Sequence, residues 1–310
     1  MKKLLEGTSA YRTFSNDVQN NRLSHAYMLD FGDAKKLREA LKIFALRFFG
    51  ESADSLDGRR ILNGNFPDFA IYPEEDKKPT ADGISALIAD SALQPLEREK
   101  KLYAICGFNE ASPLIQNKLL KTLEEPPRGI HFMLGATTTA PVLSTVKSRV
   151  KTLTVAPFAP SEILAALERR GANPLNKQAS ESCGGILGVA ENMTSGGWFE
   201  EVAEGALKIC SVTRAGEAGE IAVRYGDIKH KAELLAQIRL LFREALAERV
   251  RGDTYGKIAR LWQTPALIYA EEIADKACAD LKFNAFFQGL LYDLMLRIIE
   301  ENDKWLKLQE

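Results

Sequence analysis

The sequence has few of the residues that build metal sites. Its cysteines are dispersed and form no CxxC pair: Cys106, Cys183, Cys210 and Cys278. A zinc site usually includes at least one such short-spaced pair. The histidines, His25, His131 and His230, are equally dispersed. We therefore expect isolated thiols in a reducing compartment and no bound metal.

Long apolar runs and a strong net charge are also absent. No stretch approaches the roughly 20 apolar residues of a membrane span. The first residues, Met1–Gly7, carry two lysines but no long apolar run, which argues against a signal peptide. The net charge of -1 gives no support to a broad surface that coats nucleic acid. We expect a cytoplasmic protein without a membrane partner, whose DNA contacts, if any, are local or shared with partners.

Apolar residues make up 45% of the 310 residues, which is enough for two or three domain cores. In the first half, strand and helix patterns alternate. Strands are expected at 26–29, 69–72, 102–105, 131–136 and 150–155, and helices at 11–20, 35–49, 84–93 and 112–125. Strands separated by helices predict a parallel sheet covered on both faces, hence an α/β domain.

The pattern changes after Pro157 and Pro160. A helix is expected at 161–169, with Ser161 as its N-cap. A glycine-rich stretch at 183–188 and a second break at Gly196-Gly197 follow. From about Trp198 only long amphipathic helices are expected, such as 231–251 and 266–308. The predicted domains are 1–157 (α/β), 158–197 (small, helical) and 198–310 (all-α).

One stretch, Leu119–Pro127 (LLKTLEEPP), is more informative than its surroundings. It reads as a helix that two prolines stop, with its leucines facing the sheet. Glu124 and Glu125 lie at the helix C-terminus, where the helix dipole disfavours anions. Such a pair is either a solvated end of the helix or a functional feature.

Several motifs in order carry a resemblance to a known family. The LEEPP helix is followed by a strand, by Thr137-Thr138-Thr139 and by Ser148-Arg149-Val150; earlier come NRLSHAY at 21–27 and FPDF at 66–69. Together they resemble the clamp-loader branch of the AAA+ superfamily, in particular the delta-prime family of DNA polymerase III. The resemblance covers about residues 11–192. It implies a RecA-like parallel-sheet domain, a small helical lid domain and a C-terminal helical collar domain.

The chain departs from the family pattern at the nucleotide site. A P-loop has the form GxxxxGK[ST] and holds phosphate on backbone N–H groups at a helix N-terminus. Here the corresponding segment, Asp30–Leu37, is too short and holds one glycine, Gly32. Asp33 places an anion where phosphate would bind. Lys35 and Lys36 are interpreted as surface residues of a helix.

Four further positions that would serve the same nucleotide differ as well. The acidic pair that holds Mg²⁺ corresponds to Cys106 and Gly107. The sensor asparagine corresponds to Thr138, and the arginine of the lid motif GxxGR to Val189. Because these positions serve one ligand, their joint loss predicts that this chain binds no nucleotide or other cofactor. ATP and Mg²⁺ are expected on a neighbouring subunit instead.

Arg149, with Ser148 before it, is retained. In the family the arginine of the Ser-Arg-Cys motif projects into a neighbour's ATP site, so the resemblance implies a trans-acting arginine finger. This use does not depend on the chain's own pocket. The alternative is an ordinary surface arginine beside Lys147 and Lys151.

Many delta-prime-like chains insert a four-cysteine zinc knuckle before the strand that begins at their HPD motif, which corresponds to FPDF at 66–69 here. The corresponding segment here, residues 50–65, contains no cysteine. We therefore predict no zinc, and expect a short hairpin or turn in this polar segment.

The leading functional hypothesis is a non-catalytic clamp-loader subunit. The resemblance implies gamma/tau-like ATPase subunits and a delta-like subunit as partners, with the sliding clamp and primed DNA reached through the complex. Possible DNA or partner contacts are Lys118, Lys121, Glu124, Glu125 and Arg128. Possible collar contacts, equally readable as internal core, are Trp262, Phe286, Phe287 and Leu291. An active ATPase of the same superfamily, or an adaptor outside replication, are the alternatives.

Overall fold

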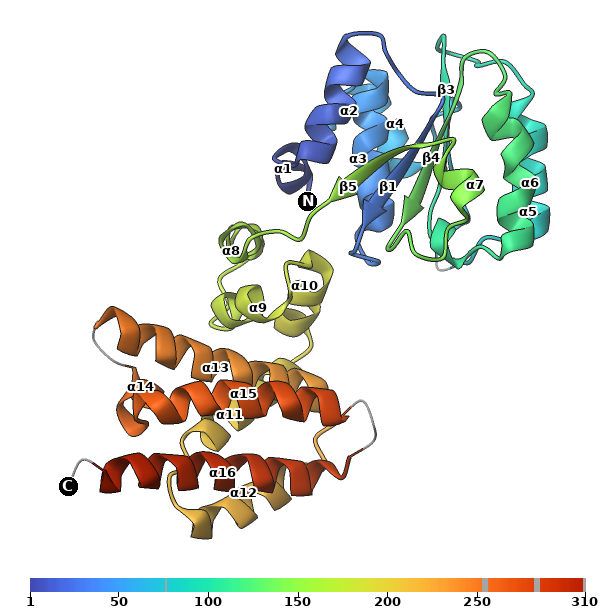
Figure 1. Cartoon of the computed structure of the whole chain (residues 1–310). Helices are drawn as coiled ribbons and strands as arrows, with labels where there is room; N and C mark the ends of the chain where they lie inside the picture. The colour runs from blue at the N-terminus through green and yellow to red at the C-terminus, as the bar shows by residue number, and fades with distance from the viewer. Residues whose placement is uncertain (76, 253–255, 282–284, 309–310) are drawn as a thin grey trace. The chain divides into compact units, whose positions relative to one another are not determined.

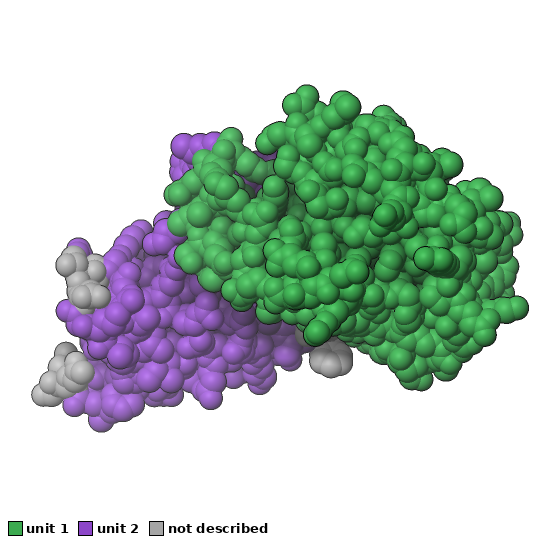
Figure 2. Space-filling view, turned by 90° about the horizontal axis from the view of Figure 1, so that it is seen from above, with its two compact units in different colours: residues 1–170, 184–189 green, residues 171–183, 190–310 purple. Residues whose placement is uncertain are grey.

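The computed structural model describes residues 1–75, 77–252, 256–281 and 285–308. These form two compact units, which Figure 2 shows in different colours. Unit 1 comprises residues 1–170 and 184–189, and unit 2 comprises residues 171–183 and 190–310. The three domain ranges expected from the sequence stay a prediction. No helix in the described part of the chain has both the length and the apolar character of a membrane span.

Unit 1 is built on a parallel sheet with the strand order β2-β3-β4-β1-β5. Its central strands are almost wholly buried, as their continuous apolar sequences require when helices cover both faces. The expected α/β architecture is therefore confirmed. The strands are β1 Ala26–Phe31, β2 Phe69–Tyr72, β3 Lys101–Ile105, β4 Ile130–Ala136 and β5 Lys151–Val155.

Helices cover both faces of the sheet (Figure 1). One layer holds α1 Lys2–Glu6, α2 Ser9–Gln19, α3 Leu37–Phe49 and α4 Leu56–Asn63. The other holds α5 Ala81–Ser91, α6 Pro113–Glu124 and α7 Ser144–Lys147. A single 3₁₀ turn, η1 Phe108–Glu110, follows β3, and α8 Pro160–Glu168 follows β5.

The helices that frame the candidate site begin and end for local reasons. In α3, Leu37, Leu41 and Phe44 recur at helical spacing and are buried against the sheet. In α6, Leu119 and Leu123 are fully buried, and the helix ends at Glu124, with Glu125 as the cap before the two prolines. The predicted apolar faces of these two helices are thus confirmed.

Two local predictions for unit 1 are wrong. The segment expected as a hairpin or turn contains α4, because the Ser55 hydroxyl accepts a hydrogen bond from Gly58 N–H and caps a helix. Ser161 is not the N-cap of α8. That position belongs to Ala159, since Pro160 supplies the fixed φ that suits the first helical residue.

Unit 2 is entirely helical among the residues described, which confirms the predicted all-α character. Its helices are α9 Asn176–Ser182, α11 Trp198–Cys210, α12 Ala215–Gly226, α13 Lys231–Arg251, α14 Lys257–Leu261, α15 Thr264–Leu281 and α16 Phe287–Lys307. A further helix, α10 Leu187–Ser195, has its first residues in unit 1 and the rest in unit 2.

The core of unit 2 includes three of the four residues considered for a collar. Trp262, Phe287 and Leu291 are at most 3% exposed, and the Trp262 indole donates to the Cys210 carbonyl at 2.8 Å. Phe286 is the exception, with 73% of its surface exposed. The interpretation as internal core therefore holds for three of the four.

The single long helix expected over residues 266–308 is wrong. The structure places α15 up to Leu281 and α16 from Phe287, with residues 282–284 outside the described part. The two helices pack against each other. The amphipathic period of α15 continues in α16 and no proline lies between them, so no sequence pattern indicated a break.

Candidate functional site

A pocket of about 390 Å³ lies at the carboxyl ends of the strands in unit 1. This edge is where open α/β sheets bind their ligands. The pocket holds charges of both signs, and Lys78 pairs there with Glu110 at 2.8 Å. Its lining residues are Ala34, Lys35, Leu37, Arg38, Glu75, Lys77, Lys78, Cys106, Gly107, Glu110 and Thr137.

Asp33 is the buried anion beside this pocket. Its side chain is 2% exposed, and its two oxygens accept hydrogen bonds from backbone N–H groups. One oxygen accepts from Lys36 at 3.2 Å, just before α3, and the other accepts from Gly188 at 2.7 Å, in the first turn of α10. Helix N-termini are the groups that bind phosphate in related folds. Here the carboxylate of Asp33, a residue of the chain itself, accepts hydrogen bonds from those N–H groups.

Gly188, the second glycine of the lid motif, permits this contact. A Cβ atom at this position would lie 2.5 Å from the Asp33 carboxylate. The first glycine, Gly185, has φ +77° and packs against the Phe158 backbone, where a Cβ would meet the carbonyl oxygen at 2.6 Å. Val189, at the position of the family arginine, is 39% exposed. Both glycines are therefore explained by packing within unit 1.

The other substituted positions of the expected nucleotide site also lie at this edge. Cys106 and Gly107 directly follow β3 and line the pocket. Burial raises the pKa of the Cys106 thiol, which disfavours the thiolate that would ligate a metal. Thr138 follows β4 and its hydroxyl accepts from the Ala140 N–H at 3.3 Å. Gly32 and Lys36 flank Asp33, and the Lys36 ammonium lies 3.6 Å from Glu39.

Arg149 lies between α7 and β5, on the surface of unit 1. Its Nη1 donates to the Thr145 carbonyl at 2.7 Å and to the Ser148 hydroxyl at 3.2 Å. Its Nη2 pairs with the Glu124 carboxylate at the end of α6. About a third of the Arg149 side chain, 32%, remains exposed. The contact also accounts for an anion at this helix C-terminus, because the guanidinium offsets the unfavourable dipole.

Gln116, which was not among the residues predicted from the sequence, joins α6 to the segment that carries Arg149. Its side chain is 1% exposed. Its amide nitrogen donates to the carbonyls of Ala111 at 2.9 Å and Pro141 at 3.2 Å, and its amide oxygen accepts from Leu143 N–H at 2.8 Å. The available signal was a polar residue one turn from Leu119, on the buried face of an amphipathic helix.

Comparisons with known proteins agree with the motifs of unit 1. Residues 7–159 match the family model described as DNA polymerase III, delta subunit. The match covers just under half of the chain. The delta' subunit of DNA polymerase III from Bacillus subtilis is 30% identical over 165 residues, which are 51% of this chain and 50% of that protein. The chain therefore spans about half the length of this relative.

Other similarities are more distant. The tau/gamma subunit of DNA polymerase III from Haemophilus influenzae is 27% identical over 147 residues, 44% of this chain and 20% of that protein. A solved gamma subunit-related protein from Thermotoga maritima aligns with 95% of this chain and 100% of its own at 14% identity, with a TM-score of 0.41. The solved clamp loader delta protein of Bacillus subtilis covers 93% and 99% at 14% identity, with a TM-score of 0.37.

The residues predicted to contact DNA or partners lie on or just after α6, within the residues that match the family model. Lys118, Lys121, Glu124, Glu125 and Arg128 are all exposed. The Lys118 ammonium already donates to the Ser85 hydroxyl at 3.0 Å. Their assignment as contacts stays a prediction.

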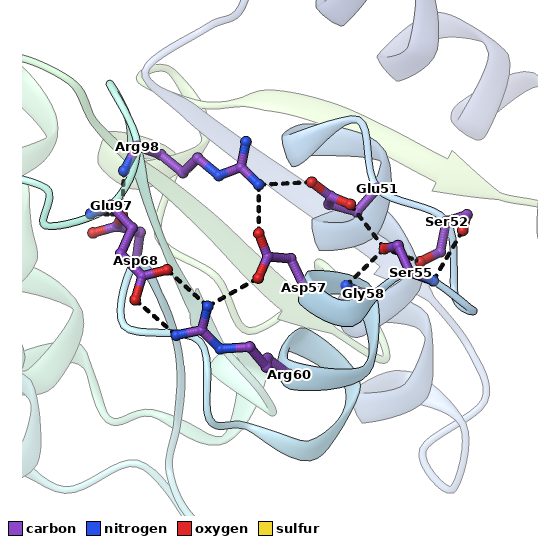
Figure 3. A network of polar contacts seen from close by, with 9 residues as sticks. All are labelled: Glu51, Ser52, Ser55, Asp57, Gly58, Arg60, Asp68, Glu97 and Arg98. Atoms are coloured by element: carbon purple, nitrogen blue, oxygen red, sulfur yellow. Dashed lines mark hydrogen bonds and ion pairs between the residues drawn. The ribbon is translucent and has the colours of Figure 1, made fainter.

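A network of charged side chains joins the segment at 50–65, where no zinc was expected, to residues 97 and 98 (Figure 3). Arg60 of α4 holds the Glu97 carboxylate through two hydrogen bonds of 2.7 Å and also contacts Asp57. Arg98 pairs with Asp57 at 2.6 Å and with Glu51 at 2.7 Å. The two guanidinium groups lower the pKa of Asp57. These contacts link α4 to the loop before β3.

Asp68, the aspartate of the FPDF motif, also holds the loop before β3. It is fully buried, and its carboxylate accepts from the N–H groups of Leu96, Glu97 and Arg98 at 2.7–2.8 Å. The motif therefore has a structural basis in this domain. In the described part of the chain, no three His, Cys, Asp or Glu residues converge as metal ligands would. The absence of zinc stays a prediction.

Proposed function

We propose that this protein is a delta-prime-like subunit of the DNA polymerase III clamp loader. In this role it binds no ATP itself and supplies Arg149 to the ATP site of a neighbouring subunit. One observation carries the proposal: the donors that would hold phosphate are taken by the buried Asp33, while the arginine of the Ser-Arg motif is retained on the surface.

The neighbouring site supplies ATP and Mg²⁺ in this proposal. A guanidinium that enters it offers planar, paired N–H donors to the phosphoryl oxygens. Arginine fingers of this kind raise the rate of phosphoryl transfer by about 10³-fold or more. Ser148 contributes indirectly, because its hydroxyl accepts from Arg149 and donates to the Thr145 carbonyl at 3.0 Å.

The assembly would contain gamma/tau-like ATPase subunits and a delta-like subunit, and would act on a sliding clamp and primed DNA. The helices of unit 2 would form this subunit's part of a collar. Lys118, Lys121 and Arg128 would contact DNA phosphates, with Glu124 and Glu125 nearby. On its own the chain would be no enzyme, and we expect it in the cytoplasm.

The first experiment is Arg149→Ala in a complex reconstituted with ATP-binding and delta-like subunits. The site that faces this chain should lose about 10³-fold in rate. DNA-stimulated ATPase should therefore fall to the level that the remaining sites supply. Arg12→Ala, which removes an exposed arginine of α2, is the matched control and should leave ATPase unchanged. Equal ATPase in the Arg149→Ala and wild-type complexes would refute the finger assignment.

The second experiment tests nucleotide binding by the full chain alone. A fluorescent ATP analogue with Mg²⁺ should show no saturable binding up to millimolar concentration. The reason is that the Asp33 carboxylate occupies the N–H groups at both helix N-termini and repels phosphate. Saturable binding at micromolar concentration would mean that the chain is a nucleotide-binding subunit.

A further inference from the structure

Arg149 is held within its own domain. Both terminal nitrogens are engaged: Nη1 with Thr145 and Ser148, and Nη2 with Glu124. Two of the three acceptors are neutral and belong to the segment that carries Arg149. Glu124 is different, because it is an anion and comes from another helix, α6. Neither side chain is buried: Arg149 is 32% and Glu124 47% exposed.

A phosphate on another subunit would require the same guanidinium nitrogens. Carboxylate and phosphate both bind the N–H fork of arginine in its plane, so an edge that holds one is not available to the other. An arginine that enters a neighbour's site must therefore give up Glu124. The exchange replaces one anion with another and is feasible because the pair is exposed rather than desolvated.

Resting on the function proposed above, we infer that Glu124 is a positioning residue that competes with the neighbour's γ-phosphate for Arg149. It holds the arginine against α6 until a neighbouring ATP site is close enough to displace it. The carboxylate thereby limits ATP hydrolysis in complexes that are not fully closed. Its position at the C-terminus of α6, where a carboxylate is otherwise unfavourable, follows from this role.

The full chain alone provides a test that needs no ATPase. Phenylglyoxal modifies exposed guanidinium groups, and mass spectrometry of peptides measures the rate at Arg149. Because an exposed ion pair contributes up to about 1 kcal/mol, Glu124→Gln should speed modification of Arg149 about two- to fivefold. The matched variant Glu99→Gln, at an exposed glutamate before β3, should leave the rate unchanged. Equal rates in Glu124→Gln and wild type would overturn the inference.

The reconstituted complex provides the second test. Without DNA, Glu124→Gln should raise kcat for ATP about two- to fivefold with KM unchanged, since the arginine acts on charge that develops in the transition state. In an Arg149→Ala background the same change should have no effect. A fall in kcat, or an effect that persists without Arg149, would overturn the inference.

The two proposals fail in different ways. If Glu124→Gln has no effect while Arg149→Ala lowers ATPase, the finger stands and the competition by Glu124 does not. If Arg149→Ala itself leaves ATPase unchanged, the proposed function fails, and the inference fails with it whatever the phenylglyoxal rates.

Discussion

Two charged side chains of unit 1, Asp33 and Arg149, differ in how they are held. At the carboxyl edge of the sheet, Asp33 is 2% exposed and satisfied by backbone donors. On the surface beside α6, Arg149 is about a third exposed and pairs with an exposed carboxylate. A buried, satisfied charge is part of the fold, whereas an exposed pair contributes little to stability and can exchange partners. Substitution of Asp33 should therefore affect stability, and substitution of Arg149 should affect function.

The largest effect is expected at Asp33. Asp33→Ala leaves the buried Gly188 N–H and the partly buried Lys36 N–H without their charged acceptor and should lower the free energy of unfolding by about 2–4 kcal/mol. Urea unfolding followed by far-UV circular dichroism measures the loss, and hydrogen exchange in β1 and β4 assigns it to unit 1. Asp54→Ala, at an exposed aspartate before α4, is the control and should be neutral. An unchanged free energy of unfolding in Asp33→Ala would remove the contrast between Asp33 and Arg149.

Gln116 offers a case between the two, because it is buried but supports the exposed arginine segment. Gln116→Leu leaves a side chain of similar size and removes three hydrogen bonds. The free energy of unfolding should therefore fall by about 1–3 kcal/mol. The same variant should also lower ATPase of the reconstituted complex, because Leu143, at the start of α7, loses its anchor. Normal ATPase from a folded variant would show that Arg149 is positioned without Gln116.

Unit 2 contains a half-buried acidic pair, Glu244 and Glu181, that extends the contrast to pH. Burial and the neighbouring Glu181 carboxyl raise the pKa of Glu244 to about 7, so the folded state binds a proton that the unfolded chain releases at lower pH. The stability from this pair is complete below pH 4.5, the ordinary value for Glu244, and is lost as pH rises through about 7.

Glu244→Gln should remove this pH dependence and stabilise unit 2 at pH 8 by roughly 1 kcal/mol, a figure reduced for solvent screening. Fluorescence is a suitable measurement because Trp198, Trp262 and Trp305 all lie in unit 2. Glu272→Gln, at an exposed position of α15, is the control. A slope between pH 5 and pH 8 that is the same in Glu244→Gln and wild type would contradict the assignment.

The smallest change in stability is expected at Arg149 itself. Arg149→Ala should alter the free energy of unfolding by no more than about 0.5 kcal/mol, since the pair with Glu124 is exposed. Urea unfolding beside Arg12→Ala provides the comparison. A loss of 2 kcal/mol or more would be about what a buried pair costs, and the arginine would then belong to the fold in the same way as Asp33.

The sequence predicted local structure well where one rule decided it. The strands of unit 1 follow from continuous apolar runs, and the end of α6 follows from two prolines. It failed where two rules competed. Ser161 is a good cap residue, but Pro160 made Ala159 the N-cap of α8. The break between α15 and α16 lies within one amphipathic pattern. The helix α4 lies in a polar segment with only a short apolar face, so no helical pattern was recognised there.

Of the candidate site, the sequence by itself determined what is missing and what is retained. The absence of a P-loop, of an acidic pair at Cys106-Gly107 and of the lid arginine is visible in the order of residues, as is Ser148-Arg149. Only the tertiary structure decided what replaces the missing groups. Asp33 meets Gly188 across 155 residues of chain, and Glu124 meets Arg149 across β4 and α7. Such contacts depend on where the folded sheet and helices place distant backbone atoms, and local sequence patterns do not contain that information.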